Sequence, residues 1–305
     1  LMIQRMYPIQ KVSRSEFVPI RQLSYHVRQW GTPDNNTPPL VMVHGWMDVS
    51  ASFQFVVDAL TQDRWVIAPD WRGFGLTETP HQDNYWFPDY LADLDFLLDH
   101  YVGDRSIHLI GHSMGGHVAT LYAGVRPERV AKLVNLEGFG MATTRPSQAA
   151  GRYAKWIDEL KTMHKGELDL KPYDDLEGVA KRLMKTNPRL SSDKAHWLAN
   201  HWARPNAQGQ WRILGHAAHK VINAQLFKVD EVLGIYERIT APTLFAMADT
   251  DSLTQWWKDK YTLDEFKQRI ASVPNLRHAV IQDAGHMLHH DQPEKLAQLI
   301  EEFLA

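Results

Sequence analysis

Hydrophobic positions in this chain fall into short continuous runs, and segments with apolar residues at helical spacing separate these runs. Runs of strand character occupy residues 39–45, 64–70, 106–112 and 129–139. Segments of helical period occupy residues 50–60, 87–101 and 115–125. Continuous apolar strands that alternate with helices predict a parallel sheet covered by helices on both faces.

The alternation stops between residues 141 and 237, where charged helical segments replace the apolar runs. It resumes with strand-like runs at 241–249 and 277–286, and a final helix starts at Pro293, a favourable residue for a first helical turn. We therefore expect an α/β core formed by residues 1–140 and 238–305, with a helical cap domain at 141–237.

Alternating residues near the N-terminus add an edge to the expected sheet. Residues 15–20 and 23–31 read SEFVPI and LSYHVRQWG, in which apolar and polar side chains alternate. This period of two is typical of a strand with one covered face. The two segments predict an antiparallel hairpin at the sheet edge.

Composition narrows the classes of partner. The chain has 305 residues, 44% hydrophobic and 23% charged, with a formal net charge of -3, so nothing draws it to nucleic acid or to an anionic membrane. It has no cysteine, which excludes disulfides, thiolate zinc sites and a cysteine nucleophile. Residues 1–17 lack the apolar core of a secretory signal, and no stretch approaches the roughly 20 apolar residues of a membrane span. We expect a cytoplasmic protein, monomeric or homodimeric.

The stretch IHLIGHSMGGHVA at residues 107–119 contains the pattern G-x-S-x-G. An apolar strand precedes Ser113 and a helical segment follows it, which is the context that this motif requires. Glycines at a sharp strand-to-helix corner leave room for a strained backbone and for an exposed hydroxyl. The motif predicts Ser113 as a nucleophile.

A serine hydroxyl needs a base to act as a nucleophile, and the expected chain order places that base after the last strand. His286 follows the strand expected at 278–282 and a small Ala-Gly turn, in the segment IQDAGHMLHHDQP. His289 and His290 are alternatives by residue type, but their place near the final helix favours solvated or capping roles. We predict His286 as the base.

The acid that orients this histidine has three candidates. Asp251 and Asp249 follow the strand at 241–249, and Glu137 lies at the tip of the strand at 129–139. Asp251 lies beyond its strand, in a loop that can reach His286, so it is the preferred acid. Asp249 fits a role in bracing that loop, and Glu137 remains the alternative acid because its strand ends at the same edge of the sheet.

An acyl-transfer site also needs two backbone donors for the oxyanion. The amide of Met114 is one, because it follows Ser113 at the start of a helix. The second is expected from the loop HGWMD, where the Trp46 amide is the preferred donor and Gly45 allows a close approach. His44 fits a structural role in this loop.

The segments VMVHGWMD, VIAPDWRGFGLT, LIGHSMGG, PTLFAMADTD and DAGHMLHHDQPE together resemble the α/β-hydrolase superfamily. HGWMDVSASFQ and LEGFG are most similar to its serine-hydrolase-like branch. The resemblance implies an eight-stranded, mostly parallel sheet with helices on both faces, and residues 141–237 as a cap over the active site. Epoxide hydrolases and haloalkane dehalogenases of the superfamily use an aspartate nucleophile, so Ser113 argues against both activities.

A Ser-His-acid triad predicts hydrolysis of carboxylic esters, thioesters or lactones through an acyl-enzyme. The same scaffold supports carbon–carbon bond hydrolysis and cofactor-free dioxygenation, and a non-catalytic binding protein is a third alternative. We expect no cofactor. We also expect no metal, because the histidine pairs in 196–202 and 215–220 lack a third ligand.

The chain is rich in tryptophan, with 11 in all. An apolar or aromatic pocket for a small-molecule substrate would use side chains near the expected site or on the cap. The predicted pocket residues are Trp46, Met47, Trp156, Trp202, Trp211 and Trp256. The alternative is that these rings only pack the cap onto the core.

Overall fold

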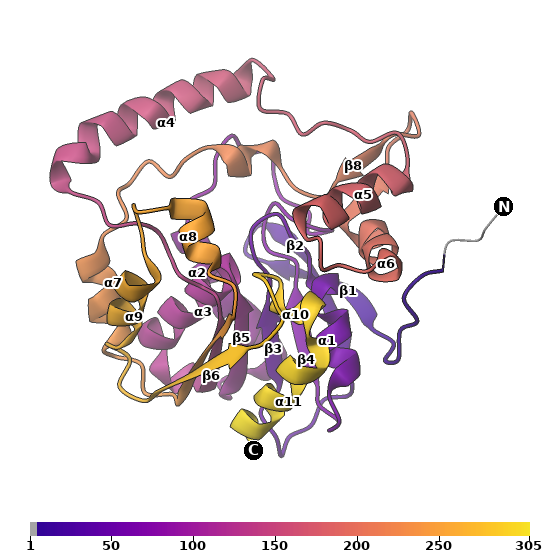
Figure 1. Ribbon diagram of the computed structural model, residues 1–305, viewed down its shortest axis with the longest axis vertical. Coiled ribbons are helices and arrows are strands. Elements are labelled where there is room, and N and C mark those ends of the chain that lie inside the picture. Colours follow the sequence, from indigo (N-terminus) through magenta and orange to yellow (C-terminus); the bar gives the residue numbers. More distant parts are fainter. Residues whose placement is uncertain (1–4) are drawn as a thin grey trace.

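The computed structural model describes residues 5–305, so four residues of the N-terminal stretch discussed above lie outside the described part. Its centre is an eight-stranded sheet in the order β1-β2-β4-β3-β5-β6-β9-β10 (Figure 1). The strands are β1 Arg14–Ile20, β2 Leu23–Trp30, β3 Leu40–Val43, β4 Val66–Pro69, β5 Ile107–His112, β6 Val130–Leu136, β9 Thr243–Ala248 and β10 Leu276–Ile281. The strands from β4 to β10 are parallel, and β1 and β2 form an antiparallel hairpin at the edge. The predicted sheet and hairpin are confirmed.

Helices cover both faces of the sheet. One face carries α2 Pro88–Val102, α3 Met114–Val125, α7 Val229–Tyr236 and α9 Leu263–Ile270, whose apolar side chains share one core cluster. The other face carries α1 Gln54–Ala59, α10 Leu288–Asp291 and α11 Pro293–Leu304. In addition, the short helix α8 Ser252–Trp257 follows β9.

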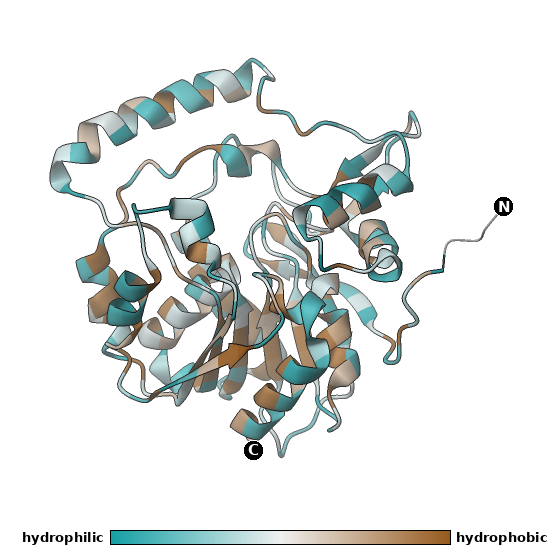
Figure 2. Ribbon diagram, viewed as in Figure 1, coloured by the Kyte–Doolittle hydropathy of each residue, from teal (hydrophilic) through white to brown (hydrophobic). Residues whose placement is uncertain are grey.

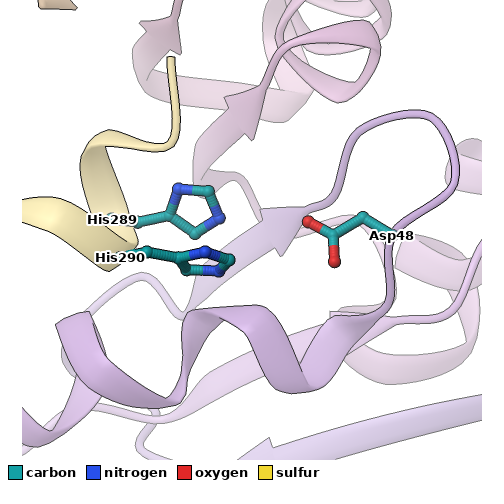
Figure 3. A group of neighbouring side chains, drawn as sticks. All are labelled: Asp48, His289 and His290. Carbon is teal, nitrogen blue, oxygen red and sulfur yellow. The ribbon is translucent and has the colours of Figure 1, made fainter. Parts of the chain in front are cut away.

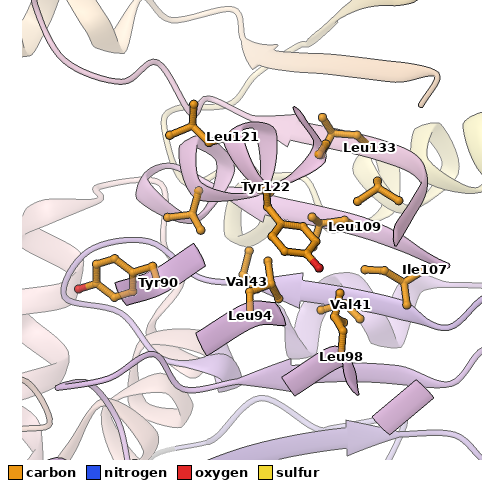
Figure 4. Packing of buried hydrophobic residues seen from close by; sticks show 14 of the residues in the cluster. Val41, Val43, Tyr90, Leu94, Leu98, Ile107, Leu109, Leu121, Tyr122 and Leu133 are labelled. Carbon is orange, nitrogen blue, oxygen red and sulfur yellow. The ribbon is translucent and has the colours of Figure 1, made fainter. Parts of the chain in front are cut away.

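The two cores explain why the central strands are continuous apolar runs. Alternate residues of a strand point to opposite faces of the sheet. In a strand that is buried on both faces, neither set of side chains faces solvent, so most positions are apolar. Val41 and Val43 of β3 pack with Leu94 and Leu98 of α2 on one face (Figure 4). Leu40 and Met42 join the cluster on the other face. The central strands of the sheet are accordingly mostly brown in Figure 2.

Residues 141–237 contain α4 Ala149–His164, α5 Leu176–Thr186, α6 Ser192–Trp202 and the small hairpin of β7 Ala203–Pro205 and β8 Trp211–Ile213. Helices α5 and α6 pack around their own apolar cluster, which also contains Phe55 of α1. Helix α4 has no buried residue and lies apart from the sheet in Figure 1.

The last helix of this segment belongs to the main core. Val232 and Tyr236 of α7 are buried in the cluster that also contains α3, although the predicted cap boundary at residue 237 assigns α7 to the cap. Only the part of the segment before α7 lies outside the two sheet-covering layers. Helix α7 has eight residues, and its position beside α3 accounts for this difference.

Candidate active site

Ser113 lies at a sharp corner between β5 and α3. Its backbone has φ 55° and ψ -122°, a left-handed conformation that a non-glycine residue rarely adopts. The corner is held by hydrogen bonds from Ser113 N–H to the Leu136 carbonyl at 2.9 Å and from His117 N–H to the Ser113 carbonyl at 3.0 Å. The structure therefore has the strained elbow that the motif predicts.

The glycines of the motif allow this corner to pack tightly. A Cβ on Gly111 would lie 2.2 Å from the carbonyl oxygen of Gly115, and a Cβ on Gly115 would lie 2.3 Å from that of Val43. Both contacts are to backbone, which cannot move aside as a side chain can. No other residue type fits these two positions without shifting α3 from β5 and β3.

His286 follows β10 and points its ring at the serine. Its Nε2 lies 2.9 Å from Ser113 Oγ. Its backbone carbonyl accepts a hydrogen bond from Nε2 of His112 at 2.7 Å, which ties this loop to the end of β5. The structure thus brings together the predicted nucleophile and base, which are 173 positions apart in the chain.

Glu137, the alternative acid, makes the carboxylate contact to this histidine. Its Oε1 lies 2.8 Å from Nδ1 of His286, and its Oε2 accepts the backbone N–H of Ala248 at 2.7 Å. The side chain is fully buried, and its backbone also has a positive φ of 55°. The carboxylate is therefore held in place by β9 on one side while it contacts the imidazole on the other.

The preferred acid, Asp251, does not contact His286 in the structure. It is exposed at the start of α8, where its two oxygens accept the N–H of Thr254 at 2.9 Å and the Thr254 hydroxyl at 2.7 Å. An aspartate that caps a helix has its oxygens engaged by that helix, which is why this residue does not turn toward the base. The sequence signal for Glu137 was its place directly after a core strand that neighbours β5.

Asp249 braces the loop before His286, whereas its position suggested that it braces the loop of Asp251. Its two oxygens accept the backbone N–H groups of Asp283 and Ala284 at 3.0 and 3.1 Å. These bonds join the ends of the neighbouring strands β9 and β10. Asp249 thus fixes the start of the loop that carries His286.

Burial changes the proton affinity of both members of the pair. It lowers the pKa of the His286 imidazole, which favours the neutral ring that can accept a proton. It raises the pKa of the Glu137 carboxyl, and hydrogen bonds from the Ala248 N–H and the Ser252 side chain counteract that rise. When the His286 imidazole takes up a proton, the buried Glu137 carboxylate lies next to the resulting positive charge.

The loop after β3 packs directly against the serine. A Cβ on Gly45 would lie 3.0 Å from the Ser113 Cβ, so the backbone next to Trp46 is at van der Waals distance from the nucleophile. Met114 is the first residue of α3, where backbone N–H groups have no partner inside the helix. Both predicted oxyanion donors therefore belong to backbone that adjoins Ser113.

His44 anchors this loop to Trp71. Its Nε2 accepts the backbone N–H of Trp71, and its carbonyl accepts the indole N–H of the same residue, both at 2.9 Å. The ring is fully buried. These contacts match the structural role expected for His44.

Of the six predicted pocket residues, Trp46 and Met47 belong to the loop after β3, Trp202 is bonded to that loop and Trp256 contacts the triad. The Trp256 ring stands edge-on to His286 with centroids 4.3 Å apart, and it is 51% exposed. Trp46 is also exposed, and its indole N–H donates to the His219 carbonyl at 3.3 Å. Trp202 donates its indole N–H to the Met47 carbonyl at 2.7 Å, so α6 is fastened to the same loop.

The other two predicted pocket residues lie elsewhere. Trp211 packs against the cluster formed by α5 and α6, and its backbone bonds to that of Tyr173. Trp156 belongs to α4, which has no buried residue. The structure therefore supports the packing alternative for Trp211 and leaves Trp156 on an exposed helix.

A group of buried polar side chains lies behind the triad. The sequence predicts solvated or capping roles for His289 and His290, but they are 0% and 5% exposed, so this prediction is wrong. The His112 ring lies 4.7 Å from that of His286 and 4.3 Å from that of His289. Helix α10 has four residues, too few to show a periodicity that would have indicated this burial.

Within residues 5–305, no helix combines the length and the apolar character needed to cross a bilayer.

Comparisons with known proteins agree with this architecture. Residues 38–293 match the family model described as the alpha/beta hydrolase fold. A serine hydrolase-like protein of Danio rerio is 28% identical over 290 residues, covering 90% of this chain and 83% of that protein. A serine hydrolase-like protein of Dictyostelium discoideum is 23% identical over 288 residues, covering 91% of this chain and 77% of that protein.

Solved structures agree as well. A thioesterase domain from the curacin biosynthetic pathway superposes with a TM-score of 0.81 at 23% identity, covering 95% of this chain and 99% of that domain. At that level of identity the likeness concerns the fold alone.

Proposed function

The chain belongs to the α/β-hydrolase family, in its serine-hydrolase-like branch, and on that premise we propose that it hydrolyses carboxylic esters through Ser113, His286 and Glu137. The observation that carries this proposal is the continuous hydrogen-bonded chain from the Ser113 hydroxyl through both nitrogens of His286 to the Glu137 carboxylate, with separations of 2.9 and 2.8 Å. Hydrogen-bond reach between a nucleophile and its base, and between that base and an orienting group, is the geometric requirement for this chemistry.

The first half of the reaction forms an acyl-enzyme. Ser113 Oγ attacks the ester carbonyl carbon while Nε2 of His286 takes the hydroxyl proton. The developing imidazolium is stabilised by Glu137, which also holds the ring in the tautomer that presents a free Nε2 to the serine. The negative charge on the carbonyl oxygen is stabilised by the backbone N–H groups of Met114 and Trp46. The C–O bond to the alcohol then breaks, and the alcohol leaves with the proton from His286.

The second half repeats these steps with water. His286 removes a proton from a water molecule, whose oxygen attacks the acyl carbon. The same two backbone donors stabilise the second oxyanion. The bond to Ser113 Oγ breaks, the serine recovers its proton from His286 and the carboxylic acid is released.

The surroundings of the triad favour a small apolar or aromatic substrate. Trp256 lies against His286, and Trp46 and Met47 follow the glycine that touches Ser113. The part of residues 141–237 before α7 acts as the cap in this proposal, because Trp202 of α6 is bonded to Met47 beside the site. Thioesters and lactones fit the same mechanism, since each presents an acyl carbon and a leaving group to the serine.

Hydrolysis of p-nitrophenyl acetate and butyrate tests the proposal. Wild-type protein should release p-nitrophenol and should be labelled by a fluorophosphonate probe, which reacts with activated serines. Ser113→Ala should abolish both signals, with a fall in kcat of about 10⁵-fold or more. If Ser113→Ala retains turnover, Ser113 is not the nucleophile. Absence of labelling in folded wild type would favour the non-catalytic alternative, and oxygen uptake with a heteroaromatic substrate would favour the dioxygenase.

A further inference from the structure

A second cluster of functional side chains lies behind the triad, between the loop after β3 and helix α10. It consists of Asp48, His289 and His290, and one ligand atom from each lies within 4.8 Å of the others. In Figure 3 the Asp48 carboxylate points toward the two imidazole rings, which lie next to each other. The three side chains come from two segments that are more than two hundred positions apart in the chain, so the fold alone brings them together.

These groups are buried without enough partners. Asp48 is 8% exposed, and its Oδ1 accepts hydrogen bonds from Val49 N–H and from the Ser52 hydroxyl. Its Oδ2 has no partner among the residues that the structure describes, and the same holds for both ring nitrogens of His289 and for Nε2 of His290. A buried polar group without a partner is costly, by about 1–3 kcal/mol each. Four such atoms on three neighbouring side chains indicate that something else satisfies them.

The walls of the cluster are apolar or aromatic. The Phe53 ring lies 5.5 Å from that of His289, and the Phe55 ring lies 5.6 Å from that of His290. Lys194 also borders the cluster, and its Nζ donates a hydrogen bond to the backbone carbonyl of His290 at 3.0 Å. Among the described residues, no side chain donates a hydrogen bond to Oδ2 of Asp48.

We propose that Asp48, His289 and His290 bind one divalent transition-metal ion, with Zn²⁺ as the best match. Two imidazole nitrogens and one carboxylate oxygen are donors that Zn²⁺ accepts, and hard cations such as Mg²⁺ and Ca²⁺ prefer an all-oxygen set. Bonds of about 2 Å from metal to ligand place neighbouring ligand atoms roughly 3 Å apart, so small side-chain rotations close the observed separation.

Such an ion would have a structural role in the active site. Asp48 follows Trp46 by two positions, and His289 follows His286 by three. A metal that joins Asp48 to His289 and His290 fastens the loop of the oxyanion donor to the loop of the base. The His112 ring contacts the rings of both His286 and His289, so it connects the proposed metal site to the base.

Metal analysis of the full-length protein tests this site. Protein from zinc-supplemented culture, washed briefly with EDTA and desalted, should contain about one zinc ion per chain by mass spectrometry. Asp48→Asn, which keeps the side-chain volume, and His289→Gln should each lose most of that metal. His108→Gln is the matched control, because His108 is also buried with an unpartnered Nδ1, at the opposite end of β5 from Ser113. It should keep the wild-type content.

Cobalt supplies a second measurement that needs only wild-type protein. Protein refolded with CoCl₂ should show the visible d–d absorption of a protein-bound Co²⁺ ion, and equimolar Zn²⁺ should displace it. The site is refuted if wild type retains no zinc and shows no cobalt spectrum. It is also refuted if Asp48→Asn and His289→Gln retain as much zinc as wild type, since the metal would then be bound elsewhere.

Discussion

Glu137 and His286 are 149 positions apart in the chain, yet Oε1 of the first lies 2.8 Å from Nδ1 of the second. The contact crosses from the end of β6 to the loop after β10, with the end of β9 between them. The bond from Ala248 N–H to the other carboxylate oxygen fixes the glutamate over that intervening strand. Three adjacent strands thus support one proton-transfer geometry.

The first prediction separates the two candidate acids. Glu137→Gln should lower kcat by about 10³-fold to 10⁴-fold, because the amide can neither stabilise the imidazolium nor fix the tautomer. Asp251→Asn should leave kcat within about threefold of wild type, because its oxygens cap α8 rather than face His286. Steady-state hydrolysis of p-nitrophenyl butyrate measures both.

Circular dichroism and thermal melting should show that both variants are folded. The opposite ranking, with Asp251→Asn inactive and Glu137→Gln active, would show that the loop after β9 rearranges to supply the acid in solution.

The second prediction concerns the serine corner. Gly111→Ala should destabilise the protein by about 3 kcal/mol or more, because the added Cβ would lie 2.2 Å from the Gly115 carbonyl oxygen. Gly234→Ala is the control, since a Cβ there meets nothing within 4 Å and the residue lies in α7. It should stabilise the protein by about 0.5–1 kcal/mol through helix propensity. Urea unfolding measures both, and equal midpoints for the two variants would contradict the packing described here.

The third prediction is a pH dependence of stability carried by Asp70. Burial alone would raise the pKa of this carboxyl, but the hydrogen bond and charge of His26 lower it below its usual value of 3.8. The Asp70–His26 separation is 2.6 Å, and both side chains are buried. Because the folded state keeps the carboxylate ionised more readily than the unfolded state, its contribution is present above pH 4 or so and is lost as the pH falls further.

Asp70→Asn should therefore cost about 3 kcal/mol of unfolding free energy at pH 7 and progressively less toward pH 3. Urea midpoints for wild type and variant, measured at several pH values, supply the comparison. A difference between the two proteins that is constant from pH 7 to pH 3 would show that Asp70 does not contribute through its charge.

The fourth prediction tests Trp256 as a pocket wall. Trp256→Ala should raise KM for an aromatic or butyryl ester by about tenfold while kcat changes little, because the ring touches His286 by its edge and offers an exposed apolar surface. Trp86→Ala removes an equally exposed ring, 58% accessible, from a site without a described contact to the triad. It should leave KM unchanged. A parallel fall in kcat in Trp256→Ala would mean that the ring positions the base instead.

The core of the fold could be predicted from sequence because its signals are local. Each buried strand is a continuous apolar run, and the elbow at Ser113 is encoded by glycines within two positions of it. The acid could not be ranked in this way, because three carboxylates follow strands at the same edge of the sheet. Only the three-dimensional structure shows that Asp251 is engaged by Thr254 and that Glu137 is free to face His286.

The burial of His289 and His290 was also beyond the sequence pattern. A helix as short as α10, Leu288–Asp291, shows no periodicity from which an inward face can be read. The same limit applied to α7, whose apolar residues joined the main core because α3 lies beside it. In both cases the deciding information is which element lies next to the segment in space.

Because Glu137 follows β6, the loop after β6 and the loop after β9 have different roles at the site. The loop after β9 holds Trp256 against the base but contributes no group to the relay from Ser113 to Glu137. Beyond Asp249 and Ser252, which support His286 and Glu137, its sequence can therefore vary, by insertion or by exchange of aromatic rings, without disabling bond cleavage. Substrate preference can evolve at that rim while the chemistry beneath it stays the same.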